Sequence, residues 1–70
     1  MAEMTPVRSS NVASVGFDPD TNELLVEFNS GQTYAYANQS EATYQDLLTS
    51  SSPGSYVARH LRHLSARRVS

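Results

Sequence analysis

The sequence predicts an α+β domain, a three-stranded antiparallel β-meander followed by two α-helices packed on one face. Apolar residues alternate with a period of two up to about residue 37 and then recur with a spacing near 3.6. A chain of 70 residues also makes one domain with a thin stability margin. We expect a single domain over residues 11–66, a flexible N-terminal arm over residues 1–10 and a frayed C-terminal tail over residues 67–70.

Three segments with alternating apolar residues are expected to form the sheet. They cover residues 11–17, 23–29 and 32–37. The turn-forming sequence DPDTN separates the first two, and NSG separates the second from the third. Gly31 in the second turn supplies the positive φ that short hairpin turns need.

Two helices are expected after the sheet. Ser40 is a favourable N-cap for the first, which opens with the acidic Glu41. Ser52 and Pro53 fit the N-cap and first position of the second helix. The apolar stripe of the second helix is expected to continue to Leu64.

Several segments together resemble the KTSC domain family, a small domain found at the C-terminus of some lysyl-tRNA synthetases and as a stand-alone bacterial or phage protein. The resemblance covers roughly residues 7–64 and is centred on the motif YAY at residues 34–36. Its other marks are Ser10, Gly16, Asp18, Gly31, Tyr44, Leu47, Ser52, Gly54, Tyr56 and Arg62. The chain departs from the family pattern at residues 39–40 and 57–58, where QS and VA replace the frequent valine-proline and phenylalanine-asparagine pairs. The resemblance implies this fold and suggests RNA binding.

Tyr34 and Tyr36 are either core residues or a stacking platform for bases. Cross-strand register decides between these roles, because the apolar face of the second strand carries Leu24, Val26 and Phe28. We expect a mixed role, in which a tyrosine ring packs in the core and its hydroxyl reaches a ligand cleft.

Cationic side chains on the second helix are expected to hold a phosphate. Arg59 lies three residues before Arg62 and four before His63, so these groups can converge on one anion. Because histidine titrates near about pH 6.5, such binding is expected to tighten as the pH falls towards about 6. The alternative is a solvated face that complements the helix dipole or pairs with Glu23 and Glu27.

Three other residues complete the expected ligand site. Ser10 and Asn11, with Ser9 before them, lie in a short polar segment that enters the first strand, where these residues are expected to contact a ligand or latch the backbone. Tyr56 is a further mark of the resemblance. No catalytic residue, cofactor or metal site is expected, because the chain has no cysteine and no acid after Asp46, and no serine lies in a recognised nucleophile motif.

The charge distribution shapes the expected function. The net charge is −2, there is no lysine, and four of the five arginines follow residue 47. This acidic balance favours a compact ligand over a long polyanion. We expect a non-enzymatic binding module for a small phosphorylated nucleotide or a short RNA, and in a phage such a module is expected to sequester a host nucleotide immune signal. The alternative is a protein–protein interaction or assembly module with no small-molecule ligand.

Location and assembly are also expectations from the sequence. The lack of cysteine, of a signal peptide and of any apolar run near the roughly 18 residues that span a bilayer favours a soluble, cytoplasmic protein. Open edge strands and a small core favour a homodimer, with a higher homo-oligomer as the other possibility.

Overall fold

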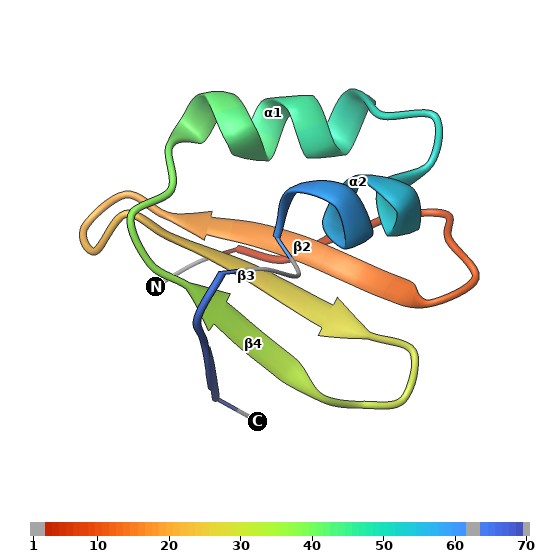
Figure 1. Ribbon diagram of the computed structural model, residues 1–70, viewed down its shortest axis with the longest axis horizontal. Helices are drawn as coiled ribbons and strands as arrows, with labels where there is room; N and C mark the ends of the chain where they lie inside the picture. The colour runs from red at the N-terminus through yellow and green to blue at the C-terminus, as the bar shows by residue number, and fades with distance from the viewer. Residues whose placement is uncertain (1–2, 62–63, 70) are drawn as a thin grey trace.

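The structure is a computed structural model that describes residues 3–61 and 64–69. It is an α+β fold in which two helices lie on the same side of a five-stranded antiparallel sheet (Figure 1). The strands follow one another across the sheet in chain order. The elements are β1 (Thr5–Pro6), β2 (Val12–Asp18), β3 (Glu23–Phe28), β4 (Thr33–Tyr36), α1 (Glu41–Thr49), α2 (Pro53–His60) and β5 (Ala66–Arg68).

The prediction of three strands is wrong, because both edges of the sheet carry an additional short strand. β1 comes from the segment expected to be an arm, and β5 lies at the start of the expected tail. The Val7 N–H donates to the Ala13 carbonyl over 3.1 Å, and the Val69 N–H donates to the Thr33 carbonyl over 2.9 Å. Strands of two and three residues are too short to show an alternating pattern, and all three side chains of β5 are exposed.

The hairpin between β3 and β4 has the turn that the sequence predicts. Gly31 has a φ of +100°, and its N–H donates to the Phe28 carbonyl over 2.9 Å. The Phe28 N–H donates to the Gln32 carbonyl over 2.8 Å and closes the loop. Such three-residue loops with glycine in the left-handed region suit the twist of a hairpin.

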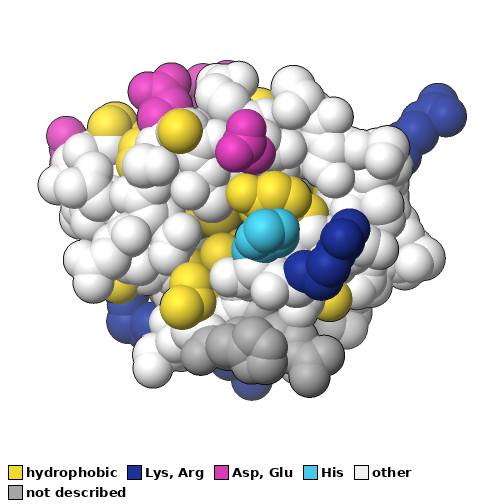
Figure 2. All heavy atoms as spheres, turned by 45° about the horizontal axis from the view of Figure 1, so that its top comes forward, with side chains coloured by type: hydrophobic (Ala, Val, Ile, Leu, Met, Phe, Trp, Pro, Cys, Tyr) yellow, Lys and Arg dark blue, Asp and Glu magenta, His cyan; other side chains and the backbone are white. Residues whose placement is uncertain are grey.

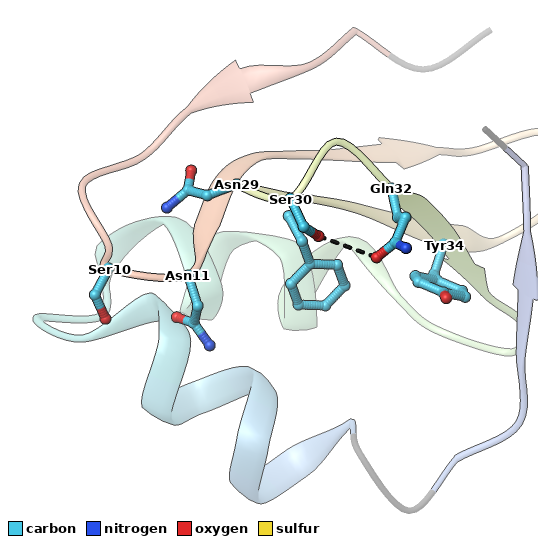
Figure 3. Close-up of a pocket in the computed structure, with 7 residues that line it drawn as sticks. Ser10, Asn11, Asn29, Ser30, Gln32 and Tyr34 are labelled. Atoms are coloured by element: carbon cyan, nitrogen blue, oxygen red, sulfur yellow. Dashed lines mark hydrogen bonds between the residues drawn. The ribbon is translucent and has the colours of Figure 1, made fainter.

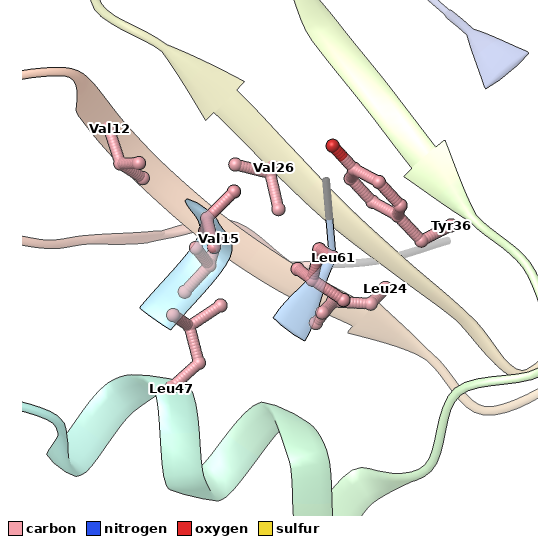
Figure 4. Packing of buried hydrophobic residues seen from close by; sticks show 8 residues of the cluster. Val12, Val15, Leu24, Val26, Tyr36, Leu47 and Leu61 are labelled. Atoms are coloured by element: carbon pink, nitrogen blue, oxygen red, sulfur yellow. The ribbon is translucent and has the colours of Figure 1, made fainter. Parts of the chain in front are cut away.

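The core lies between the sheet and the two helices (Figure 4). Its fully buried aliphatic side chains come from β2, β3, α1 and the end of α2: Val12, Val15, Leu24, Val26, Leu47 and Leu61. Leu24 pairs with Tyr36 and Val26 pairs with Tyr34. Directly opposed residues share a face, so both tyrosines lie on the helix-bearing side of the sheet.

Both helix starts agree with the predictions. The Ser40 hydroxyl accepts a hydrogen bond from the Thr43 N–H over 3.3 Å and caps α1. Ser52 is the N-cap of α2 and Pro53 its first residue, although the Ser52 side chain makes no capping hydrogen bond. Proline suits this position, because the N–H of the first helical residue has no acceptor within the helix and its absence costs no hydrogen bond.

The second helix ends earlier than the apolar stripe indicates. α2 ends at His60, so the expected continuation to Leu64 is wrong. Leu64 lies outside the helix and is 43% exposed, and its N–H donates to the Leu61 carbonyl over 2.9 Å. After Leu64 the chain forms β5, which pairs with β4.

Candidate functional site

A cavity of about 450 Å³ opens beside the β3–β4 hairpin (Figure 3). Two aromatic rings, Phe28 and Tyr34, contribute to its lining. Three amide side chains, Asn11, Asn29 and Gln32, and two serines complete it. Two separate parts of the chain therefore meet here: the segment before β2, and the hairpin from the end of β3 through its turn to β4.

The two rings of the cavity contact each other edge to face. Their centroids are 5.9 Å apart and their planes are inclined by 71°. Phe28 and Tyr34 are both half-buried, because they stand on the helix-bearing side near the hairpin end of their strands. The cavity thus has an aromatic surface with the hydrophobic core behind it.

Tyr36 has a different role from Tyr34, although the two are only one residue apart. Tyr36 is 6% exposed and packs with the core cluster. Burial, followed by the neighbouring Tyr34 phenol, raises the pKa of the Tyr36 hydroxyl above its usual value of 10.0. Tyr34 lines the cavity and Tyr36 does not appear in its lining. The mixed role expected of the motif is divided between the two residues.

The three amides are oriented by hydrogen bonds within the protein. Asn11 Oδ1 accepts from the Ser9 hydroxyl over 2.9 Å, and Gln32 Oε1 accepts from the Ser30 hydroxyl over 3.0 Å (Figure 3 shows the latter). Asn29 Nδ2 donates to the Ser9 carbonyl over 3.2 Å. The remaining groups are the NH₂ donors of Asn11 and Gln32 and the Oδ1 acceptor of Asn29, none of which bonds to another described residue.

The segment before β2 is held in place by Ser9. Its hydroxyl oxygen accepts from the N–H groups of Asn11 and Val12, each over 3.3 Å. The Asn29 N–H donates to the Asn11 carbonyl over 2.9 Å and ties this segment to the hairpin. Ser9 is therefore the backbone latch, while Ser10 and Asn11 line the cavity. The sequence analysis expected Ser9, Ser10 and Asn11 to act as a backbone latch or as ligand contacts, and the hydrogen bonds assign the latch to Ser9.

A second hollow, of about 340 Å³, lies at the N-terminus of α2 and shares Ser10 and Asn11 with the first. Arg8 and Gly54 also line it. A Cβ atom added to Gly54 would collide with Asn11 Oδ1 and lie 2.8 Å from the Ser9 hydroxyl. A side chain at position 54 would thus have to displace the side chains of Asn11 and Ser9.

The expected cations of α2 do not join the described lining of the Tyr34 cavity. Arg59 is exposed on α2 and is absent from both hollows. Arg62 and His63 lie outside the described residues. The structure therefore brings Tyr34 together with Ser10 and Asn11, but not with Arg59.

A different arginine lies next to Tyr34. Arg68 of β5 is directly opposite Tyr34 of β4, so its side chain leaves the sheet on the same face. Arg67 leaves on the other face, where it donates to Glu23 over 2.8 Å. Hydrogen bonds from Arg67 and then Thr21 hold the pKa of Glu23 below its usual 4.5. Both arginines belong to β5.

Tyr56 of α2 is half-buried against the core, and its ring contacts the ring of His60. Their ring centroids are 4.4 Å apart, with the planes inclined by 30°. Burial, followed by the charge of Asp46, raises the pKa of Tyr56 above 10.0. Figure 2 shows hydrophobic side chains gathered beside a histidine on the helix-bearing side. Tyr56 lines neither hollow, so the structure separates it from Tyr34.

Within residues 3–61 and 64–69, no three histidines, cysteines or acids form a group that could hold a metal ion. No helix within these ranges is long and apolar enough to cross a membrane.

Comparison with known proteins gives three consistent findings. The family model described as the KTSC domain matches residues 8–64. A protein of Tsukamurella paurometabola is 37% identical over 54 residues, which are 77% of this chain and 81% of that protein. The crystal structure of a KTSC domain protein from Yersinia pestis superposes with a TM-score of 0.89 at 28% identity, covering 100% of both chains.

Proposed function

The chain belongs to the KTSC domain family, and from the geometry of the Tyr34 cavity we propose that it is a non-enzymatic binding module for a nucleotide-type ligand. The observation that carries this proposal is the combination, in one cavity of about 450 Å³, of two aromatic rings with three amide side chains. That volume lies within the usual range of small-molecule sites, about 300–1,000 Å³.

The aromatic part of the cavity suits the face of a base. Tyr34 is half-buried and held edge to face by Phe28, so its ring is available without reorganising the core. Stacking of a base on an aromatic side chain contributes about 1–3 kcal/mol and tolerates all bases. We therefore assign base stacking to Tyr34.

The amides suit the edge of the same base. Asn11 and Gln32 each retain an NH₂ donor, and Asn29 retains an oxygen acceptor. Nucleobases carry ring nitrogens, carbonyl oxygens and exocyclic amines that match these groups. Because Asn11 and Gln32 are already oriented through their oxygens, little side-chain freedom is lost when a ligand binds.

A phosphate on the same ligand has two candidate positions. Arg68 stands opposite Tyr34 on the same face of the sheet, and Arg8 lies in the second hollow beside Asn11. Either guanidinium can fork onto a phosphate. A third candidate position is the cluster expected from the sequence, Arg59, Arg62 and His63. Substitution of single arginines distinguishes the three positions.

The proposal includes no chemical change of the ligand. A protein that binds a nucleotide and returns it intact acts by sequestration, and this is the role we propose for a phage-borne copy. After incubation with the chain, chromatography is expected to recover the added nucleotide unchanged. Conversion of the nucleotide with turnover would contradict the non-enzymatic assignment.

Thermal-shift measurement with nucleoside monophosphates, cyclic nucleotides and short RNA oligomers tests the proposal. A ligand that binds only the folded state stabilises it by an amount that grows with ligand concentration, about 2.7 kcal/mol at a ligand concentration of one hundred times Kd. This stabilisation raises Tm. We expect Tyr34→Ala and Asn11→Ala to abolish the shift and Tyr34→Phe to retain it. The phosphate position is identified by comparing three variants, Arg68→Gln, Arg8→Gln and, on α2, Arg59→Gln. The variant that loses the thermal shift marks the arginine that holds the phosphate. A panel without any saturable shift would exclude the proposed function.

A second candidate function is a protein interaction module without a small ligand. The exposed edge of β5 favours it, because an unpaired strand edge offers main-chain hydrogen bonds to another chain. Isothermal titration calorimetry with nucleotides separates the candidates, since this second function predicts no heat of nucleotide binding.

A further inference from the structure

The hydrogen bonds of β5 show which of its main-chain groups face outward. The Val69 N–H donates to the Thr33 carbonyl, so these two residues form a hydrogen-bonded pair of the antiparallel ladder. Bonded and non-bonded pairs alternate along such a ladder. The main-chain N–H and carbonyl groups of Arg67 therefore face β4. The main-chain N–H and carbonyl groups of Ala66 and Arg68 point away from β4, towards the open edge of the sheet.

The outer side of β5 is an edge of the sheet. Among the described strands, β5 pairs with β4 alone. All three of its side chains are exposed. An extended chain that approached this edge would find the Ala66 N–H and carbonyl at the spacing of a strand ladder.

The opposite edge of the sheet is protected in a way that β5 is not. The Val7 N–H donates to the Ala13 carbonyl, which makes Val7 a bonded residue and places Pro6 at the outward-facing position of β1. Proline has no N–H to offer there, and proline on an edge strand prevents pairing with other chains. β5 has alanine at its corresponding outward position.

The charge of β5 selects the kind of chain that can pair with it. Arg67 and Arg68 project to opposite faces, and the chain has no acidic residue after Asp46. In a symmetric pairing of two copies centred on Arg67, that arginine would face its own copy, and directly opposed like charges destabilise a sheet. Arg67 donates to Glu23 through Nη2, but its side chain is 65% exposed, so carboxylates on an added strand would lie opposite the arginines and could accept from the other guanidinium donors of Arg67.

From these observations we propose that β5 receives an extended acidic segment of a partner protein, which adds to the sheet as a further antiparallel or parallel strand. Main-chain hydrogen bonds to Ala66 supply the attachment, and acidic side chains beside Arg67 and Arg68 supply the selectivity. This site lies on the outer edge of β5, and it shares Arg68 with the face of the sheet that carries Tyr34.

A blocked synthetic peptide of alternating glutamate and valine is the probe. Titrated into the ¹⁵N-labelled chain, it is expected to shift the Ala66 amide signal and to slow hydrogen exchange at Ala66. The binding is expected to weaken at about 0.5 M salt, where exposed charges are screened. The control peptide alternates lysine and valine, and equal binding of both peptides would overturn the acidic selectivity.

Substitution of Ala66 tests the main-chain contact. Ala66→Pro removes the outward N–H but keeps the inward bonds of Arg67 and Val69, so the free chain is expected to keep its Tm and lose about tenfold or more in peptide affinity. Ala66→Val is the matched control, since it keeps the N–H and is expected to bind like the native chain. Native affinity in Ala66→Pro would refute strand addition at β5.

A modified peptide gives a test that does not depend on how the variants fold. Methylating the backbone nitrogen of every second residue removes the N–H donors along one edge of the peptide. Two such peptides are compared, one methylated at the odd positions and the other at the even positions. We expect one of the two to lose binding to the native chain. Tight binding of both methylated peptides would contradict the proposal. Conversion of a dimeric native chain to a monomer by Ala66→Pro, without any peptide, would show that a second copy occupies the edge and would also overturn it.

Discussion

Tyr34 and Tyr36 differ in exposure, and from this difference we expect Tyr36 to contribute more to stability, while binding is proposed only for Tyr34. Tyr36 is 6% exposed in the core cluster, whereas Tyr34 is half-buried at the cavity. We expect Tyr36→Ala to lower the free energy of unfolding by about 3–5 kcal/mol, as for other large buried side chains, and Tyr34→Ala by about half as much. Urea denaturation measures both. A larger loss for Tyr34→Ala would contradict this division of roles.

The ion pair between Arg67 and Glu23 makes a prediction about pH. The folded-state pKa of Glu23 is below 4.5, so the stabilisation is present above the unfolded value and is lost as the pH falls through the lowered pKa. Arg67→Gln is expected to move the Glu23 midpoint upward in a ¹³C carboxyl NMR titration, because its main charge-assisted hydrogen bond is removed. Arg8→Gln is the control. An unchanged midpoint in Arg67→Gln would show that the pair is not formed in solution.

At the scale of elements, α2 and the latch segment fit together at Gly54. Alanine usually stabilises a helix relative to glycine by up to about 1 kcal/mol, but here its Cβ would collide with the Asn11 carboxamide. We expect Gly54→Ala to give no stabilisation, to displace the Asn11 side chain and to weaken nucleotide binding. Changes in Tm and in the Asn11 side-chain NMR signals measure these effects.

The double variant Gly54→Ala with Asn11→Ser supplies the control for that prediction, since the shorter serine leaves room for the new methyl group. It is expected to recover the helix-propensity gain. A Gly54→Ala chain stabilised by about 1 kcal/mol with unperturbed Asn11 signals would count against the close packing of these elements.

The central elements were predictable because they carry periodic patterns or specific capping residues. Alternation located β2, β3 and β4, Gly31 marked the hairpin turn, and Ser40 marked the start of α1. The edge strands were not predictable in this way, because β1 and β5 are held by pairing with distant strands and contain only two and three residues. The end of α2 at His60, before Leu64, was likewise not indicated by the apolar stripe.

The candidate site was predictable only in part. Tyr34, Ser10 and Asn11 were expected at a ligand site, and the structure brings them into one cavity. Asn29 and Gln32 were read only as residues around the Gly31 turn, since a turn and a binding loop share the same polar composition. The position of Arg68 opposite Tyr34 depends on the β4–β5 register, which no local pattern encodes.

At the scale of the whole molecule, assembly remains a prediction. A 70-residue chain without cysteine has a small core, and we expect a homodimer to supplement it. Light scattering coupled to size-exclusion chromatography should give twice the 7.7 kDa of one chain at micromolar concentration. Because Pro6 blunts one edge and like charges oppose symmetric pairing at the other, the dimer is expected to survive Ala66→Pro. A 7.7 kDa species would end the dimer prediction.

The account depends most on the ability of the Tyr34 cavity to hold a base. An NMR titration with nucleoside monophosphates, monitored at side-chain amides, tests this directly. We predict saturable shifts at Asn11, Asn29 and Gln32, with Asn22 and Gln45 unchanged as internal references, and no such shifts with ribose 5-phosphate. Unchanged cavity amides at millimolar concentrations of every nucleotide, or equal shifts with the base-free sugar phosphate, would contradict the claim.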